Sequence, residues 1–183
     1  AALLADKHVL IEYPPTTELD QHKRLLDLSA SKGLIYHIGL TYRLSPQHQQ
    51  LKAMLNAHAD GDSSLGKPIA YIMSGCRGRP IRRWYDKEEP SGGMFVASCY
   101  DMIDQALDLL GPVKEIQARY ISNRLDNSVI ERDCANLMLA FESGCTGMFT
   151  YVRGGSQPGI GFTRTVFCDK GYLIISGGRI QKL

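Results

Sequence analysis

Apolar and polar positions follow two different patterns along this chain, and the change between them falls near residue 110. Before that point, short apolar runs alternate with longer segments in which apolar residues recur every three or four positions. Short runs are typical of buried strands, and the wider spacing is typical of amphipathic helices. Beyond that point the pattern indicates strands, at 113–121, 134–142, 146–152, 163–168, 171–176 and 179–183.

A strand, a helix and a second strand are predicted near the start of the chain. Residues 1–7 have the pattern of a helix end, and the apolar run at 8–13 stops at two prolines. A helix then extends from the capping threonines at 16–17 to Gly33, and 34–38 form a strand. Strand, helix and strand within so short a stretch predict a βαβ unit with parallel strands.

Two further helices enclose another strand. Ser45 followed by proline predicts a capped helix start, and 69–73 predict a strand. A long helix follows from about Met94 to Leu110, with Phe95, Cys99, Ile103, Ala106 and Leu110 on its apolar face.

The fold class expected from these elements is α/β followed by α+β. A two-stranded βαβ unit cannot bury its own faces, so the first portion is expected to be incomplete. The second portion is expected to be a mostly antiparallel, open-faced β-sheet domain with helices on one face. Residues 137–141 and 172–175 are apolar on both faces of their strands, which indicates a partner subunit or domain over the open face.

Composition narrows the class of protein. The chain has 183 residues, is 44% hydrophobic and carries a net charge of +2, so we expect binding to neither nucleic acid nor membrane. No apolar run approaches the roughly 20 residues of a membrane span. Five cysteines, with no C-x-x-C pair, favour neither a disulfide framework nor a zinc site, so we expect no metal and a cytoplasmic location.

Candidate chemistry gathers where the two parallel strands end. Glu12 and Tyr13 close the first strand, and Tyr42 and Arg43 follow the second. Carboxyl ends of parallel strands share one sheet edge, where α/β proteins bind ligands. A phenol with a lowered pKa can donate a proton to a substrate. Aromatic packing at the end of a strand is the alternative for Tyr13.

Two other groups of polar residues have open interpretations. Asp101 and Asp104 lie one helical turn apart and can face one cleft, but with Asp108 they also form a stripe typical of a solvated helix face. Arg82 and Arg83, next to Trp84, can clamp a carboxylate or phosphate. An exposed basic loop is the alternative for that segment.

Several segments, in collinear order, resemble a family of nicotinamide-dependent oxidoreductases. They are A-A-L-L-A-D-K-H-V-L-I-E-Y-P at 1–14, T-Y-R-L-S-P at 41–46, the S-G-G helix from 91 to Asp104, and the hairpin at 135–144. They are similar to segments of the glucose–fructose oxidoreductase, inositol dehydrogenase and rhizopine-catabolism (Gfo/Idh/MocA) family.

The resemblance implies hydride transfer between NAD or NADP and a small carbonyl or hydroxyl compound, either sugar-like or a tetrapyrrole. It implies that 1–43 are the C-terminal part of a Rossmann-like domain whose glycine fingerprint lies upstream. It further implies that 44–183 are a substrate-binding and oligomerisation domain that continues beyond the chain. On this interpretation the chain alone is inactive and binds dinucleotide weakly.

The family's motifs also assign roles to individual positions, some of which depart from the pattern. Tyr13 stands where the family has lysine, Asp101 where it has histidine, and Ala97 where it has aspartate, whereas Asp104 is retained. An E-Y-P triplet also occurs in the biliverdin-reductase branch. The assigned residues are, for catalysis, Tyr13 and Asp101; for the cofactor, Glu12, Tyr13, Pro14, Tyr42 and Arg43; and for the substrate, Arg82, Arg83, Trp84, Tyr100 and Asp104.

A non-catalytic module is the alternative. The exchanges at the lysine, aspartate and histidine positions fit a fold kept for dimerisation or ligand binding. In either case we expect a homodimer or homotetramer that forms through the open sheet face.

Overall fold

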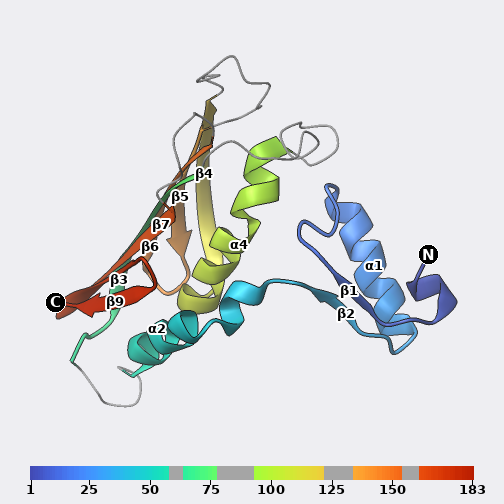
Figure 1. The fold of residues 1–183 in the computed structure, drawn as a ribbon, viewed down its shortest axis with the longest axis horizontal. Coiled ribbons are helices and arrows are strands. Elements are labelled where there is room, and N and C mark those ends of the chain that lie inside the picture. Colours follow the sequence, from blue (N-terminus) through green and yellow to red (C-terminus); the bar gives the residue numbers. More distant parts are fainter. Residues whose placement is uncertain (58–63, 78–92, 122–133, 154–160) are drawn as a thin grey trace.

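The computed structural model describes residues 1–57, 64–77, 93–121, 134–153 and 161–183. It contains a two-stranded parallel sheet near the N-terminus and a seven-stranded sheet in the order β4-β5-β6-β3-β7-β8-β9. The small sheet and its helix stand beside the large sheet and are connected to it by an extended segment and a short helix (Figure 1).

The N-terminal unit is the expected βαβ arrangement. Strands β1 (Val9–Ile11) and β2 (Tyr36–Ile38) pair in parallel, with Val9 opposite Tyr36, and helix α1 (Leu19–Ser31) connects them. Gly33 follows the helix with φ +63°, a conformation that glycine adopts without the penalty of a side chain.

Two local expectations in this unit were wrong. The first residues form only a 3₁₀ turn, η1 (Leu3–Ala5), which ends at Asp6 in a left-handed conformation. Helix α1 has no side-chain cap: its N-cap residue is Glu18 rather than a threonine, and Thr16 Oγ1 donates a hydrogen bond to the carbonyl of Glu18 (2.9 Å).

The connection to the large sheet begins with the 3₁₀ turn η2 (Thr41–Leu44) and continues as helix α2 (Pro46–Asn56). Ser45 Oγ accepts a hydrogen bond from the backbone N–H of His48, so the predicted capped start is confirmed. Leu51 and Leu55 on this helix are buried in the main hydrophobic core.

The large sheet is mostly antiparallel, as expected. Its strands are β3 (Pro68–Arg77), β4 (Val113–Ile121), β5 (Cys134–Phe141), β6 (Thr146–Arg153), β7 (Gly161–Cys168), β8 (Gly171–Ser176) and β9 (Arg179–Lys182). The parallel pair is β3 with β6.

Strand β3 is longer than its apolar run predicted. It continues through Ser74 and Gly75 to Arg77 because both of its edges are paired, with β6 and with β7. The ring of Phe162 lies over Gly75, where an added Cβ would come within 2.2 Å of it. So close an approach of the ring leaves room only for glycine at this position. The apolar pattern of the sequence does not predict that the strand continues through it.

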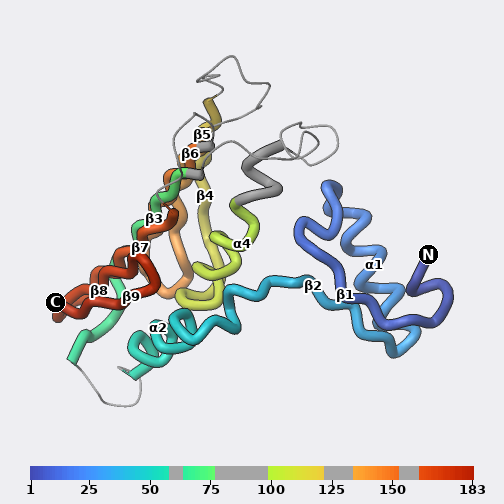
Figure 2. Tube along the Cα trace, viewed as in Figure 1, coloured from blue at the N-terminus to red at the C-terminus, as the bar shows by residue number. Residues whose placement is uncertain are grey.

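Helix α4 (Gly93–Leu110) lies along one face of the large sheet, as the tube in Figure 2 shows. Cys99, Met102 and Ala106 on this helix are almost fully buried against strand residues such as Tyr71 and Phe149. The opposite face carries exposed apolar side chains, and no described element covers it in Figure 1. These side chains are Ile72, Met138, Met148 and Phe167. The expected fold class is therefore confirmed.

Candidate functional site

The end of β1 meets helix α4 through a pair of aromatic rings. Tyr13 and Tyr100 stack with their ring centroids 6.2 Å apart and an interplanar angle of 16°. The peptide bond between Tyr13 and Pro14 is cis. Glu12, immediately before, is exposed. The structure therefore brings two of the residues predicted from the sequence, one assigned to catalysis and one to the substrate, into contact across the two parts of the chain.

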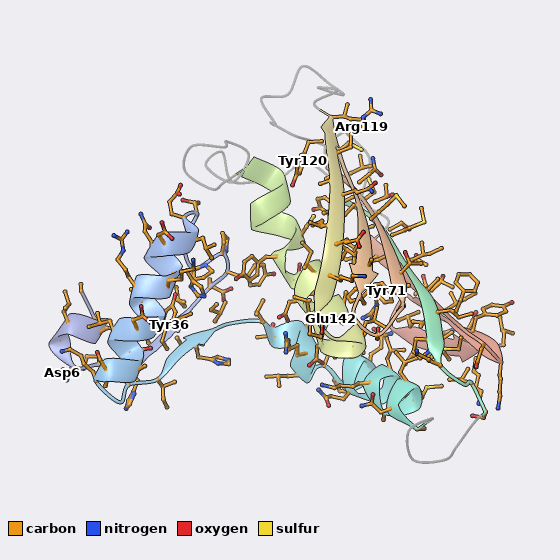
Figure 3. The ribbon with its side chains drawn as sticks, turned by 180° about the vertical axis from the view of Figure 1, so that it is seen from behind. Asp6, Tyr36, Tyr71, Arg119, Tyr120 and Glu142 are labelled. Atoms are coloured by element: carbon orange, nitrogen blue, oxygen red, sulfur yellow. The ribbon has the colours of Figure 1, made fainter. Side chains whose placement is uncertain are left out.

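A third tyrosine belongs to this corner and was missed in the sequence. Tyr36 lies on β2 within the N-terminal unit (Figure 3). Burial, and secondarily Tyr100, raise its pKa. Its buried hydroxyl oxygen has no hydrogen-bond partner among the described residues. In the sequence, Tyr36 stands within the apolar run at 34–38 and looks the same as an aromatic residue of the core.

The hydroxyl of Tyr100 is also kept protonated. Burial raises its pKa first, and the nearby carboxylate of Asp104 raises it further. Tyr36 and Tyr100 are therefore neutral at physiological pH and remain able to donate hydrogen bonds.

The three aspartates of α4 face inward. Asp101 is 2% exposed and Asp104 is 8% exposed, and the side chain of Asp108 is also largely buried. The interpretation of this stripe as a solvated helix face was therefore wrong. Asp104 and Asp108 are buried because basic side chains on η2 and α2 pair with them, and the spacing of residues along α4 does not show these partners.

Arg43 and His48 connect these aspartates to the preceding helices. The guanidinium of Arg43 donates from Nε and Nη2 to the carboxylate of Asp104, and from Nη1 to Asp108 Oδ1 (3.1 Å). His48 Nε2 lies 2.9 Å from Asp108 Oδ2, and Lys52 Nζ donates to Oδ1 at 2.8 Å. Sequence reasoning missed His48, which is fully buried.

The carboxyl of Asp108 has a lowered pKa. Burial acts to raise the pKa, but hydrogen bonds from Lys52 and His48, together with the charges of Lys52 and Arg43, outweigh that effect. Asp108 is therefore a stable anion that anchors α2 to α4.

The other residues predicted for the site do not all lie at this corner. Tyr42 is 40% exposed and lines a cavity beside α2, and Pro14 is half-buried next to Tyr13. The guanidinium of Arg43 is engaged by the two aspartates. Arg82, Arg83 and Trp84 lie outside the described residues.

Within the described part of the chain, no group of three or more His, Cys, Asp or Glu side chains is arranged to hold a metal ion. Among the same residues, none of the helices combines the length and the hydropathy that a bilayer span requires.

Comparison with known proteins gives consistent matches. A sequence model described as the C-terminal alpha/beta domain of an oxidoreductase family (GFO_IDH_MocA) matches residues 62–176. An oxidoreductase of Synechocystis sp. is 28% identical over 98% of this chain and 51% of its own length. The chain thus spans about half the length of that curated relative.

Solved structures share the fold. Biliverdin reductase from Synechocystis sp. PCC 6803, in complex with biliverdin and NADP+, has a TM-score of 0.76 and 24% identity, and the match covers all of this chain and 58% of that one. The WlbA dehydrogenase from Bordetella pertussis, in complex with NADH and UDP-GlcNAcA, has a TM-score of 0.83 and 21% identity over 98% of this chain and 55% of that one.

Proposed function

The chain belongs to the Gfo/Idh/MocA family of oxidoreductases, and we propose that its protein transfers hydride between NAD or NADP and a small carbonyl or hydroxyl compound. The observation that carries the proposal is the stacking of Tyr13 on Tyr100. It places the carboxyl end of a parallel strand, where α/β proteins bind ligands, against a helix that carries buried aspartates.

The residues at this corner fit the nicotinamide end of the cofactor. Tyr13 offers an aromatic surface, and the exposed carboxylate of Glu12 is an acceptor for the N–H groups of an amide. The bound cofactor supplies or accepts the hydride. Pro14, Tyr42 and Arg43 would border the nicotinamide end of the cofactor. Arg43 would act there through its ion pair with Asp104.

Residues of this chain would donate the proton that the substrate oxygen needs. When a carbonyl is reduced, its oxygen gains a proton as its carbon gains the hydride, and we assign the donor role to the Tyr13 hydroxyl. Asp101 would orient the substrate, and in the reverse direction the Tyr13 phenolate would take the proton back from the hydroxyl compound. Tyr100 and Asp104 would contact the substrate from the same side, and we keep Arg82, Arg83 and Trp84 as candidates for its other side.

The relatives suggest two substrate classes. Biliverdin, a tetrapyrrole, is bound by one neighbour and UDP-GlcNAcA, a nucleotide sugar, by another. Both are candidates for this protein.

We assign residues 1–43 to a nucleotide-binding domain and 44–183 to a substrate-binding and oligomerisation domain.

The experiment is a fluorescence titration of the protein, expressed from its complete coding sequence, with NADPH and with NADH. Saturable binding of either one is expected, followed by its oxidation with a carbonyl substrate from one of the two classes. If neither nucleotide binds, the proposed reaction is contradicted.

A non-catalytic module that keeps the fold for dimerisation is the second candidate, and the exposed apolar face of the large sheet fits its dimerisation. Met138 and Met148 are cross-strand partners on that face and are 52% and 50% exposed. Apolar side chains gathered on an open sheet fit a subunit interface, and we propose a homodimer or homotetramer through it. Such an interface is compatible with either function.

A reducing compartment suits the protein. All five cysteines are free thiols, and burial raises the pKa of Cys145 to about 11, which suppresses its reactive thiolate. We therefore propose a cytoplasmic location.

A further inference from the structure

A cavity of about 320 Å³ lies between the first turn of α2, the middle of α4 and the strands β7 and β8. This volume is at the lower end of the range for small-molecule sites. Apolar side chains of Met73, Phe162 and Ile175 form one part of its wall. The polar part of the wall includes Gln47, Gln105 and Arg164, together with Tyr42, Ser45 and Ser176.

Arg164 is the unusual member of this wall. It is 7% exposed, and its guanidinium donates from Nη1 to Gln105 Oε1 (2.8 Å) and from Nη2 to Gln47 Oε1 (3.0 Å). Among the described residues, no carboxylate lies within ion-pair distance of it. A buried charge is costly unless an opposite charge compensates it, and amide oxygens carry only partial charges.

Tyr71, which lies next to Arg164, does not provide the missing negative charge. The positive charge of Arg164 favours the phenolate, but burial dominates and raises the pKa of Tyr71 to about 12. Tyr71 is therefore a neutral phenol under physiological conditions, and its hydroxyl donates to Met73 Sδ (3.5 Å).

Gln47 adds an unused donor on the same wall. Its Nε2 is buried and has no hydrogen-bond partner among the described residues, while its Oε1 is held by Arg164. Within the described residues, the positive charge of Arg164 on the cavity wall is therefore uncompensated, and the buried N–H groups of Gln47 beside it are unsatisfied. An oxyanion would satisfy both.

We propose that this cavity binds the carboxylate of a small hydroxylated organic acid. One guanidinium compensates one negative charge, so a carboxylate fits better than a phosphate dianion, which would leave excess charge buried. The amide of Gln105 would receive the hydroxyl groups, and Met73, Phe162 and Ile175 would cover the carbon chain. Binding of such an acid does not depend on the hydride-transfer proposal.

The test is isothermal titration calorimetry of the protein, from its complete coding sequence, with sodium D-gluconate and with sodium glycolate. D-glucose is the neutral counterpart of gluconate, and inorganic phosphate tests the alternative anion. At least one of the two acids is expected to bind saturably with one site per chain. Glucose and phosphate are expected to bind at least about tenfold more weakly.

Two variants locate the site. Arg164→Gln removes the charge and is expected to weaken binding of the acid at least about tenfold. Gln47→Glu places a carboxylate beside the guanidinium, so it is expected to weaken binding to a similar extent while raising the melting temperature. Gln50→Glu adds the same charge on the exposed side of α2 and is expected to leave the affinity unchanged.

The proposal is overturned if neither acid binds, if glucose or phosphate binds as tightly as the acids, or if Gln47→Glu leaves the affinity unchanged. Should Arg164→Gln not fold, the comparison of Gln47→Glu with Gln50→Glu decides the question.

Discussion

The guanidinium of Arg43 holds the carboxylate of Asp104 through hydrogen bonds from Nε and Nη2, across 61 residues of sequence. Arg43 lies on the turn that leaves the N-terminal unit, and Asp104 lies on the helix that covers the large sheet. Their contact therefore fixes the position of η2 against α4. The stacking of Tyr13 on Tyr100, one helical turn from Asp104, depends on that position.

Asp104→Asn is expected to destabilise the protein by about 2–3 kcal/mol, because a charge-assisted hydrogen bond to a partly buried arginine is lost. Urea unfolding, followed by circular dichroism, gives the free energy. Asp27→Asn, on the exposed surface of α1, is the matched control and should change it little. Equal effects of the two substitutions would show that the Arg43–Asp104 contact does not anchor the helix.

The stability of the protein is expected to fall on acidification through Asp108. Its pKa is lower in the folded than in the unfolded chain, so its contribution is present above the unfolded value, about 3.9, and is lost as pH falls through the folded value. Asp108→Asn should reduce stability at pH 7 and flatten the decline between pH 5 and pH 3. Urea unfolding between pH 5 and pH 3 measures the free energy of unfolding. If this free energy declines equally with falling pH in the native protein and in Asp108→Asn, Asp108 is not the cause.

Tyr71 is expected to limit stability in alkali. Its pKa is raised to about 12 in the folded protein, so its contribution is intact below the unfolded value and is lost as pH rises through the folded one. The loss amounts to about 2–3 kcal/mol between pH 10 and pH 12. Tyr71→Phe should behave similarly to the native protein at pH 7 and lose less stability above pH 10. If the free energy of unfolding falls equally with pH above 10 in both proteins, the ionisation of Tyr71 is not the cause.

The open sheet face is expected to form the subunit interface. Replacing both Met138 and Met148 with glutamate places charges on cross-strand neighbours and should convert the oligomer into a monomer in size-exclusion chromatography with light scattering. Leu19→Glu, at an exposed apolar position of α1, should leave the assembly intact. A native protein that is already monomeric at micromolar concentration would contradict the interface.

Elements of the fold were predictable from the sequence where local chemistry decides them. The Ser45 cap, the left-handed Gly33 and the alternation in the late strands are properties of a few adjacent residues. The length of β3 was not predictable, because Gly75 and Cys76 are held by neighbouring strands rather than by their own pattern.

The candidate site was predictable only in part. Tyr13 was singled out from its place at a strand end, and Asp104 from the resemblance to the family's helix motif. The burial of Asp101, Asp104 and Asp108 was not predicted, because a polar stripe has the same spacing whether it faces water or basic partners. Tyr36, His48 and Arg164 were missed for a related reason, since their significance arises from contacts between distant elements.

The Tyr13 hydroxyl is proposed to donate the proton that accompanies hydride transfer. The turnover number for NADPH or NADH oxidation by the Tyr13→Phe variant tests this role, with Tyr172→Phe on the large sheet as the control. We expect a loss of about 10²-fold or more for Tyr13→Phe, unchanged cofactor affinity, and near-native turnover for the control. Native turnover in Tyr13→Phe would rule out this role.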